Sequence, residues 1–253
     1  MAGIIELKNV SFTAQNMNIV SDFSFMFEEG KTTAIIGPSG SGKSTVLKLA
    51  AGLLVPAAGE INFRGKDVFT MSRQENLDFR REAAMVFQDS ALWANQNLYQ
   101  ILELPLRTHF PNMPPAERND RIKEVLKQVG YKRDTTIRPS QLSMGEQKLI
   151  GFARALMCRP KLLFLDEWTE SMDESAVQKI NRVLYNHIQA QNTVIFVSHD
   201  LRFIKTLADT IILMTEGKYA DSFFRGEIDN DEDLAQYLEK GKTREEAKPE
   251  AQP

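Results

Sequence analysis

One eight-residue segment limits the folds open to this chain more than any other feature. Residues 37–44 read Gly-Pro-Ser-Gly-Ser-Gly-Lys-Ser, which matches the pattern G-x-x-x-x-G-K-[ST]. An apolar run at Thr32–Ile36 precedes the segment, and an apolar helical face that begins at Val46 follows it. Glycines allow a tight turn whose N–H groups converge on phosphate oxygens, and the N-terminus of the next helix favours the same anion. The segment therefore predicts a strand–loop–helix unit that binds the phosphates of a nucleotide.

The phosphate loop, residues 37–45, contains side chains with separate roles. We predict that Lys43 reaches the β- and γ-phosphates and that the Ser44 hydroxyl binds Mg²⁺. A glycine-rich turn that matches the pattern by chance is the alternative, and it is disfavoured because the flanking strand and helix are both present. The predicted phosphate-binding residues are Gly37, Pro38, Ser39, Gly40, Ser41, Gly42, Lys43, Ser44 and Thr45.

Short apolar runs recur along the chain and alternate with helical patterns. Several runs are too uniformly apolar for a half-exposed strand and suit strands that are covered on both faces. We therefore predict an α/β fold with a largely parallel core, preceded by an N-terminal antiparallel β meander before Thr32. The predicted strands are Ile4–Phe12, Thr32–Ile36, Glu60–Phe63, Ala84–Phe87, Leu162–Leu165, Thr193–Val197 and Ile211–Met214. The predicted helical faces contain Val46, Leu47, Leu49, Ala50, Leu53 and Leu54, and then Leu149, Phe152, Ala153 and Leu156.

The segment between residues 90 and 138 differs from its surroundings, because it is rich in proline and has no strand pattern. A helix is expected to begin near Pro115 and to end at Gly130. We predict a helical lobe at 90–138, inserted into a P-loop α/β core formed by 1–89 and 139–225. Residues 226–253 form a predicted C-terminal extension, and from about Lys240 its polar composition predicts a disordered tail.

Composition excludes several classes of function. The chain has 253 residues with 31 basic and 34 acidic side chains, and its net charge of −3 disfavours a nucleic-acid partner. Its one cysteine, Cys158, excludes an internal disulfide and a site of several thiolates. Its apolar runs fall short of the roughly 18 residues that a membrane helix needs, and no secretory signal is expected at the N-terminus.

Two carboxylates follow the predicted strand Leu162–Leu165. Because P-loop ligands bind at the carboxyl edge of a parallel sheet, Asp166 is placed to hold Mg²⁺. Glu167 is expected to point elsewhere and to accept a proton from the water that attacks the γ-phosphate. An ordinary solvated strand end is the alternative, and the upstream phosphate loop favours the catalytic interpretation.

Two further polar residues also follow predicted strands. His199, after Thr193–Val197, is expected to contact the γ-phosphate and to hold the attacking water and Glu167. Gln88, after Ala84–Phe87, is expected to contact the metal or the water. The predicted catalytic residues are therefore Glu167, His199 and Gln88, and the predicted Mg²⁺ ligands are Ser44, Gln88 and Asp166. The other two histidines, His109 and His187, are interpreted as structural.

A segment that we call the signature segment, Leu142-Ser143-Met144-Gly145-Glu146-Gln147, precedes the second predicted helical face. With the motifs above it resembles the ATP-binding cassette (ABC) ATPases in order and spacing over residues 4–220. The resemblance implies a head-to-tail dimer in which ATP lies between the phosphate loop of one copy and the signature segment of the other. It places Ser143, Gly145, Glu146 and Gln147 at the partner's nucleotide, and Asp173 in the loop that connects the two sites. Ser143 and Glu146 also match a helix-capping box, and both roles can hold.

Three positions depart from the family pattern. Ala14 stands where the family usually has an aromatic that stacks on adenine, so adenine is expected to be held less tightly. Met144 replaces the first glycine of the signature, and Trp168 replaces the usual proline after the acid pair. ATPase activity is expected to survive these changes, while coupling between the two sites is less certain from the sequence.

A transport role requires separate membrane subunits, because this chain has no predicted membrane segment. Such permease subunits are expected to dock near Gln88 and the lobe, with Leu92 and Trp93 as apolar contacts or, alternatively, as part of the lobe core. The segments 86–92 and 104–107 are similar to the ATPases of Mla-type phospholipid transporters, which work with lipid-binding MCE proteins. This resemblance implies a peripheral protein on the cytoplasmic face of the inner membrane.

Two other functions remain open from the sequence. An ATPase subunit of an ABC importer or exporter for another solute would differ only in its cargo. A non-transport ABC protein that acts on DNA or ribosomes usually has two cassettes in one chain or a long coiled-coil insertion, and neither pattern is present. A module that binds ATP without hydrolysing it is disfavoured because Glu167 is present.

Overall fold

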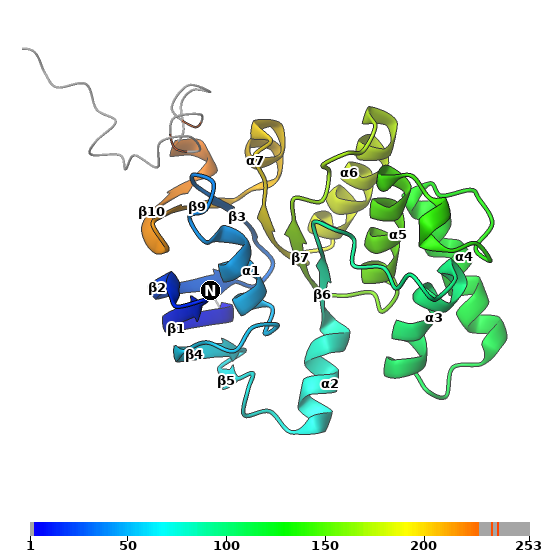
Figure 1. Ribbon diagram of the computed structural model, residues 1–253, viewed down its shortest axis with the longest axis horizontal. Coiled ribbons are helices and arrows are strands. Elements are labelled where there is room, and N and C mark those ends of the chain that lie inside the picture. Colours follow the sequence, from blue (N-terminus) through cyan, green and yellow to red (C-terminus); the bar gives the residue numbers. More distant parts are fainter. Residues whose placement is uncertain (1–2, 228–233, 235–236, 238–253) are drawn as a thin grey trace, which may run out of the picture. The chain divides into compact units, whose positions relative to one another are not determined.

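The computed structural model describes residues 3–227 together with Leu234 and Tyr237. The chain divides into two compact units, one formed by residues 1–71 and 193–253 and the other by residues 72–192. Each unit is described by itself (Figure 1). The predicted disordered tail from about Lys240 lies outside the described residues.

The first unit contains an antiparallel sheet with the strand order β2-β1-β4-β5. The strands are β1 (Gly3–Ala14), β2 (Met17–Glu28), β4 (Ala58–Phe63) and β5 (Lys66–Asp67). Gln15 and Asn16 connect β1 to β2 with φ angles of 51° and 62°, which is the left-handed geometry that a two-residue hairpin turn requires. The predicted antiparallel meander at the N-terminus is confirmed.

Parallel strands form the second sheet region of the first unit. β3 (Thr32–Ile36) runs parallel to both β8 (Thr193–Val197) and β9 (Thr210–Thr215), and β10 (Lys218–Phe224) is antiparallel to β9. Every residue of β3 and β8 is buried, which agrees with their many apolar residues, and the threonines that begin both strands are buried as well. These two predicted strands have the same bounds in the structure.

Helices α1 (Lys43–Ala50) and α7 (Leu201–Leu207) and the short 3₁₀ helix η2 (Arg225–Glu227) complete the described part of the first unit. The predicted first helical face extended to Leu53 and Leu54, and this extension is wrong. Gly52, with φ of 62°, takes the left-handed conformation that ends a helix, and Leu53 is exposed.

The second unit pairs two parallel strands with five α-helices. β6 (Ala83–Val86) runs parallel to β7 (Leu162–Asp166), so that residues 83–86 lie beside residues 162–165. The helices are α2 (Arg73–Glu82), α3 (Leu98–His109), α4 (Pro115–Val129), α5 (Met144–Leu156) and α6 (Glu174–Gln189), with a 3₁₀ turn η1 (Pro139–Gln141). The predicted start of α4 at Pro115 is confirmed, as is its end at Gly130, which has φ of 76°.

Apolar faces of α3, α4 and α5 pack against one another in the second unit. Ile101, Ile122, Val125 and Phe152 are among the buried side chains that fill this core. The predicted lobe at 90–138 lies wholly within the second unit, and its boundaries stay a prediction. No helix among the described residues is long and apolar enough to cross a membrane.

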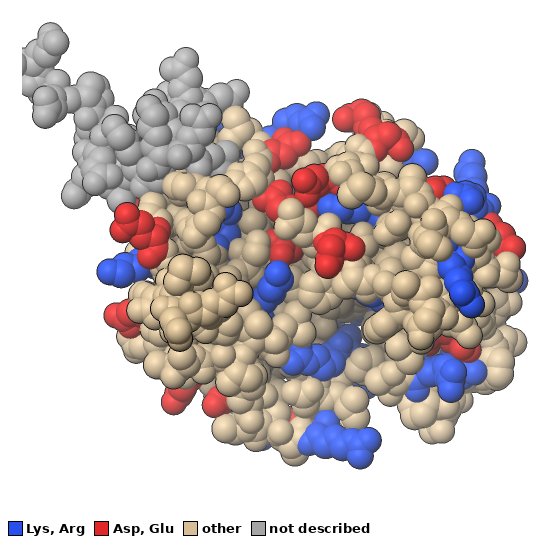
Figure 2. All heavy atoms as spheres, viewed as in Figure 1, with Lys and Arg blue, Asp and Glu red and all other residues tan. Residues whose placement is uncertain are grey.

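Charged side chains of both signs are interspersed on the face that Figure 2 shows. Blue and red residues alternate there with uncharged surface, and the described residues on this face form no continuous basic stripe. The mixture of both signs on this face agrees with the small net charge of −3.

The half-buried histidine of α6, His187, predicts how the stability of the fold depends on pH. Burial lowers the pKa of His187 from its usual 6.5 to about 4. Between these values the unfolded chain binds a proton at this residue that the folded chain cannot bind, so stability falls as the pH is lowered from 6.5 towards 4. The loss attributable to His187 is roughly 2–3 kcal/mol across that range. We expect His187→Gln to remove this part of the acid destabilisation.

The measurement is urea unfolding of wild type and His187→Gln at about pH 7.5 and about pH 5. The difference in unfolding free energy between the two pH values should be smaller in the variant, which lacks the titrating imidazole. Equal acid destabilisation of the two proteins would contradict the assignment.

Candidate functional site

The phosphate loop lies in the first unit and leads directly from β3 into α1. Gly42, with φ of 91°, is the N-cap of α1 and has no side chain with which to cap it. The N-terminus of α1 therefore relies on other groups, and an anion is favoured there. Lys43 is only 6% exposed, and its Nζ donates to the carbonyls of Gly37 at 2.9 Å and Pro38 at 2.8 Å. The loop thus holds a buried cation beside a helix N-terminus.

The β1–β2 hairpin packs directly against the phosphate loop. A Cβ atom at Gly42 would lie 2.8 Å from the carbonyl oxygen of Ile19 and 3.5 Å from Cγ2 of Val20, so only glycine fits there. This contact places residues 19 and 20 of β2, which follow the hairpin end that contains Ala14, beside the loop. The Ser41 hydroxyl is buried and has no hydrogen-bond partner among the described residues. A phosphate oxygen is a group that could satisfy it.

His199 follows β8 in the same unit as the phosphate loop. Burial lowers the pKa of His199, and the positive charge of Lys43 lowers it further. The imidazole is therefore neutral at physiological pH and can donate one hydrogen bond and accept another. Asp200, the next residue, caps α7 by accepting from the backbone N–H of Arg202 at 2.9 Å. The structure thus brings His199 and Lys43 into one electrostatic environment.

The acid pair ends β7 in the second unit. Asp166 is the last residue of this strand and is 1% exposed. Glu167 leaves the strand with φ of 43°, a left-handed conformation that is unusual for a residue with a side chain. The reversal of the backbone at Glu167 breaks the strand geometry, so the two carboxylates do not simply alternate across a sheet. Such strained residues cluster at functional sites.

The amide of Gln88 is oriented by an acidic neighbour. Its Nε2 donates to Oε2 of Glu170 at 3.1 Å. With its nitrogen held by Glu170, the amide presents its oxygen on the other side, and an amide oxygen is the kind of ligand that Mg²⁺ accepts. Asp166 adds a carboxylate in this unit and Ser44 a hydroxyl in the first, so the predicted donors are all hard oxygens. The chemistry of these donors suits Mg²⁺.

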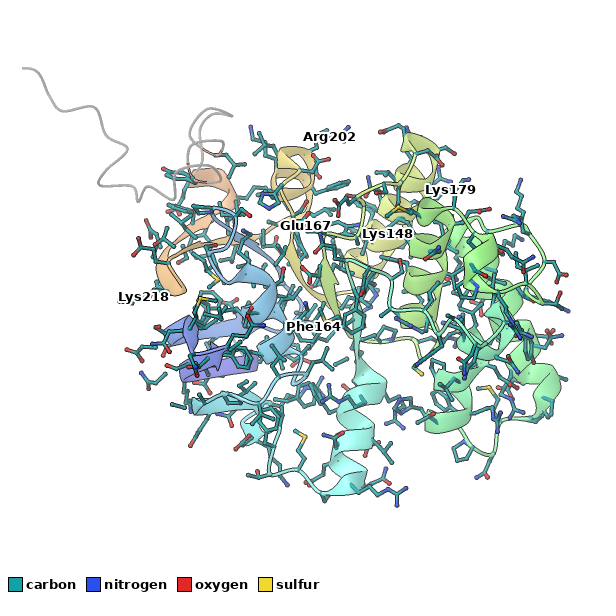
Figure 3. The ribbon with its side chains drawn as sticks, in the orientation of Figure 1. Lys148, Phe164, Glu167, Lys179, Arg202 and Lys218 are labelled. Carbon is teal, nitrogen blue, oxygen red and sulfur yellow. The ribbon has the colours of Figure 1, made fainter. Side chains whose placement is uncertain are left out.

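A buried lysine contacts the backbone of the predicted catalytic acid. Nζ of Lys148, on α5, donates to the main-chain carbonyl of Glu167 at 2.9 Å (Figure 3). Burial lowers the pKa of Lys148, while the carboxylates of Glu170 and Glu167 act in the opposite direction. Neither Lys148 nor Glu170 is predicted from the sequence. The signal that could have identified Lys148 is its place four residues before Phe152, on an apolar helix face where a lysine needs a partner.

The signature segment forms the N-terminal end of α5. The Ser143 hydroxyl accepts from the backbone N–H of Glu146 at 3.2 Å, and the Glu146 carboxylate accepts from the backbone N–H of Ser143 at 2.9 Å. The capping-box alternative is therefore confirmed. The hydrogen bond from the Ser143 N–H lowers the pKa of Glu146, and Arg133 adds to this effect. Gln147 donates to the carbonyls of Pro139 and Leu142, both at 3.3 Å.

The loop after the acid pair packs closely against this helix end. A Cβ atom at Gly145 would lie 3.1 Å from the carbonyl oxygen of Ser171, tighter than ordinary contact. Asp173 ends the loop and caps α6 by accepting from the backbone N–H of Ala176 at 2.9 Å. Trp168, which stands where the family has proline, is fully buried. The second unit thus brings together Gln88, the acid pair, the signature segment and Asp173.

Comparisons with known proteins agree with the motifs. A family model described as ABC transporter matches residues 20–170. The methionine import ATP-binding protein MetN 2 of Enterococcus faecalis is 33% identical and is matched over 87% of this chain and 66% of its own length. The nickel import ATP-binding protein NikE of Shigella flexneri is 35% identical over 82% of this chain and 79% of its own.

Solved structures show the same architecture. The ATP-binding cassette MJ0796, described as a dimer in a post-hydrolysis state bound to ADP and phosphate, has a TM-score of 0.80 and 28% identity, with 87% of this chain and 98% of that chain covered. CbiO1 of Clostridium perfringens has a TM-score of 0.75 and 25% identity, with 92% and 93% covered. The family match spans more than half of the residues, and it includes both the phosphate loop and the acid pair. The chain therefore belongs to the ABC transporter family of ATPases.

Proposed function

We propose that this chain is the nucleotide-hydrolysing subunit of a membrane transporter, and that two copies bind ATP head to tail. The observation that supports this proposal most directly is that the N-termini of α1 and α5 are capped differently. Gly42 leaves the start of α1 without a side-chain cap, while Ser143 caps α5 only through an exchangeable hydroxyl bond. Both helix ends favour an anion, and a triphosphate between two copies would meet one of each.

In this proposal Lys43 and the phosphate loop hold the β- and γ-phosphates, and Ser44, Gln88 and Asp166 would supply oxygen ligands to Mg²⁺. When bound, the metal would neutralise charge that develops on the phosphate oxygens. Glu167 accepts the proton of the attacking water, and the neutral His199 holds that water and the γ-phosphate. Because phosphoryl transfer needs little covalent help, positioning by these groups supplies most of the catalysis.

Closure of the dimer links hydrolysis to movement. ATP can drive closure only if it binds the closed dimer more tightly than the open one. The Ser143 hydroxyl and the Gly145 amide supply contacts to the partner's γ-phosphate, and Asp173 lies in the loop between the sites. Cleavage of the γ-phosphate removes these contacts, so the copies separate. The hydrogen bond from Glu146 to Ser143 must open or be shared when the hydroxyl contacts phosphate, which adds a cost to closure.

Permease subunits dock, in this proposal, on the loop that follows Gln88. Trp93 is 44% exposed, so the alternative of a buried lobe-core role is wrong for this residue. The Arg154 guanidinium lies 5.5 Å from the centre of the Trp93 ring and its Nη2 donates to the carbonyl of Ser90 at 3.1 Å. A large exposed aromatic held rigid by its neighbours is typical of binding hot spots. Through such a permease the chain would lie on the cytoplasmic face of the membrane.

The relatives favour a solute importer as the transporter. MetN 2 and NikE are named for methionine and nickel import, and CbiO1 is described as part of the transporter complex CbiONQ. These names support the importer alternative better than phospholipid trafficking, and they give no support to an MCE protein as a partner. We therefore propose a small-solute importer, with phospholipid trafficking as the second candidate.

The catalytic assignment of Glu167 predicts a separable effect of its carboxylate. We expect Glu167→Gln to bind ATP but to hydrolyse it about 10²–10⁴-fold more slowly, because the general base is removed while the phosphate loop is intact. ATP, but not ADP, should convert this variant to a stable dimer, as measured by light scattering after gel filtration. Glu117→Gln, at an exposed position on α4, controls for the loss of a carboxylate elsewhere in the unit. Hydrolysis by Glu167→Gln at the wild-type rate would refute the base assignment.

The missing adenine-stacking residue predicts a gain of affinity. We expect Ala14→Tyr to tighten ATP binding by about tenfold, because an aromatic stacked on a base contributes roughly 1–3 kcal/mol. Thr13→Tyr is the matched control, since neighbouring strand residues face opposite sides of the sheet. Titration with a fluorescent ATP analogue measures both affinities. Equal affinities for the two tyrosine variants would contradict the placement of adenine beside Ala14.

The docking proposal predicts a loss of membrane association. We expect Trp93→Ala to weaken binding to membranes that contain the native permease by about 2 kcal/mol, or roughly thirtyfold, while ATP hydrolysis by the isolated subunit persists. Tyr185→Ala, which removes another exposed aromatic of the second unit, is the control. Sedimentation with native membranes measures the bound fraction of each variant. If Trp93→Ala and Tyr185→Ala bind alike, Trp93 does not contribute to the docking surface.

A further inference from the structure

Lys148 is the charged residue of α5 that lies deepest in the second unit. It follows the signature segment directly and is only 4% exposed. Burying an ammonium is costly unless hydrogen bonds and opposite charges compensate. Lys148 obtains both, because its Nζ donates to the Glu167 carbonyl at 2.9 Å and four acidic residues attract it. In decreasing order of effect these residues are Glu170, Glu167, Asp166 and Asp89.

The acceptor of this hydrogen bond lies at the strained point of the acid pair. Glu167 has φ of 43°, and a non-glycine residue keeps this conformation only when its surroundings hold it there. Two donors converge on its carbonyl oxygen, the ammonium of Lys148 at 2.9 Å and the backbone N–H of Glu170 at 3.4 Å. The direction of the Glu167 side chain follows from this backbone, so Lys148 acts on the carboxylate without touching it.

Two other contacts involve the loop that begins at Glu167. Gly145 approaches the carbonyl of Ser171 so closely that a Cβ atom would be only 3.1 Å away. Glu170, in the same loop, receives the amide hydrogen bond of Gln88 at 3.1 Å. These contacts hold the first turns of α5 against the loop that begins at Glu167. A displacement of the helix therefore displaces this loop as well.

We propose that Lys148 is a positioning residue for ATP hydrolysis, which holds the backbone of Glu167 to the helix that carries the signature segment. The inference rests on the proposed function, because it assumes that Glu167 is the base and that the signature segment contacts the partner's nucleotide. Its consequence is that the base of one site is aligned only when the helix contacting the other site is in place. A positioning error of about 1 Å can reduce turnover roughly 100-fold, so one hydrogen bond suffices for such control.

The test replaces the ammonium by an apolar group of similar length. We expect Lys148→Met to lower kcat about 10–100-fold with KM for ATP within about twofold of wild type, because the phosphate loop that binds the nucleotide is unchanged. Lys148→Arg keeps both the charge and the donor and should recover most of the lost kcat. Lys179→Met controls for the loss of one cation from the second unit, since Lys179 is exposed on α6 (Figure 3).

Steady-state kinetics and melting temperature are measured for all variants, with Glu167→Gln in parallel. A purely structural role predicts a lower melting temperature in Lys148→Met with kcat restored at a temperature where the variant is folded, and that result would overturn the inference. Wild-type kcat in a folded Lys148→Met would do the same. Active Glu167→Gln would instead refute the base assignment on which both proposals rest, so the two failures are distinguishable.

A second variant keeps the test decisive if Lys148→Met does not fold. Lys148→Gln has an arm one bond shorter and no charge, so its amide cannot reproduce the ammonium contact with the Glu167 carbonyl. We expect the same loss of kcat with little change in KM. A folded Lys148→Gln with the kcat of Lys179→Met would overturn the proposal.

Discussion

The proposed function depends on one physical constraint, which is that the concentrated negative charge of a triphosphate is stabilised by fixed dipoles at helix N-termini. Two helices begin where such charge is expected, and their caps differ. The start of α1 has glycine as its N-cap and a buried Lys43 beside it. The start of α5 is closed by its own capping box, in which the serine bond is the longer at 3.2 Å. In the proposed dimer, one helix end is ready for phosphate in the isolated chain, and the other must exchange a hydrogen-bond partner to receive it.

Electrostatics in the second unit explains why polar residues occur inside an apolar helix face. Asp166 is buried at the end of β7, and Glu167 follows it in a strained turn. Lys148 supplies a compensating positive charge from α5, and Glu170 orients the amide of Gln88. Removing Lys148 would take a compensating positive charge away from the buried Asp166, which is more costly than the loss of a surface ion pair. The network therefore ties the geometry of the acid pair to the position of one helix.

Local sequence patterns predicted the strands and helices with strongly patterned sequences. The remaining features depend on tertiary contacts between residues far apart in the sequence. Strands β3 and β8 were predicted with their observed bounds because every residue in them is buried and most are β-branched, which favours strands. The α1 helix was predicted too long, since an apolar spacing continues past Gly52 while the backbone does not. The Lys148–Glu167 contact joins residues 19 positions apart across two elements, and no spacing rule within one helix or strand reveals it. Glu170 was not predicted from the sequence either, and its partner Gln88 lies 82 residues away.

The positions at which this chain departs from the family pattern change side chains and leave the local backbone geometry unchanged. Met144 is 66% exposed at the first position of α5, so it changes the surface of the signature segment and leaves the Ser143 cap formed. Gly145, which follows it, is the position that cannot accept a side chain without moving the Ser171 carbonyl. Trp168 replaces a proline, yet it is buried and adds packing beside the acid pair. A glycine retained at the close approach, next to a glycine lost at the exposed tip, indicates that backbone access at Gly145 is the feature this helix end must keep.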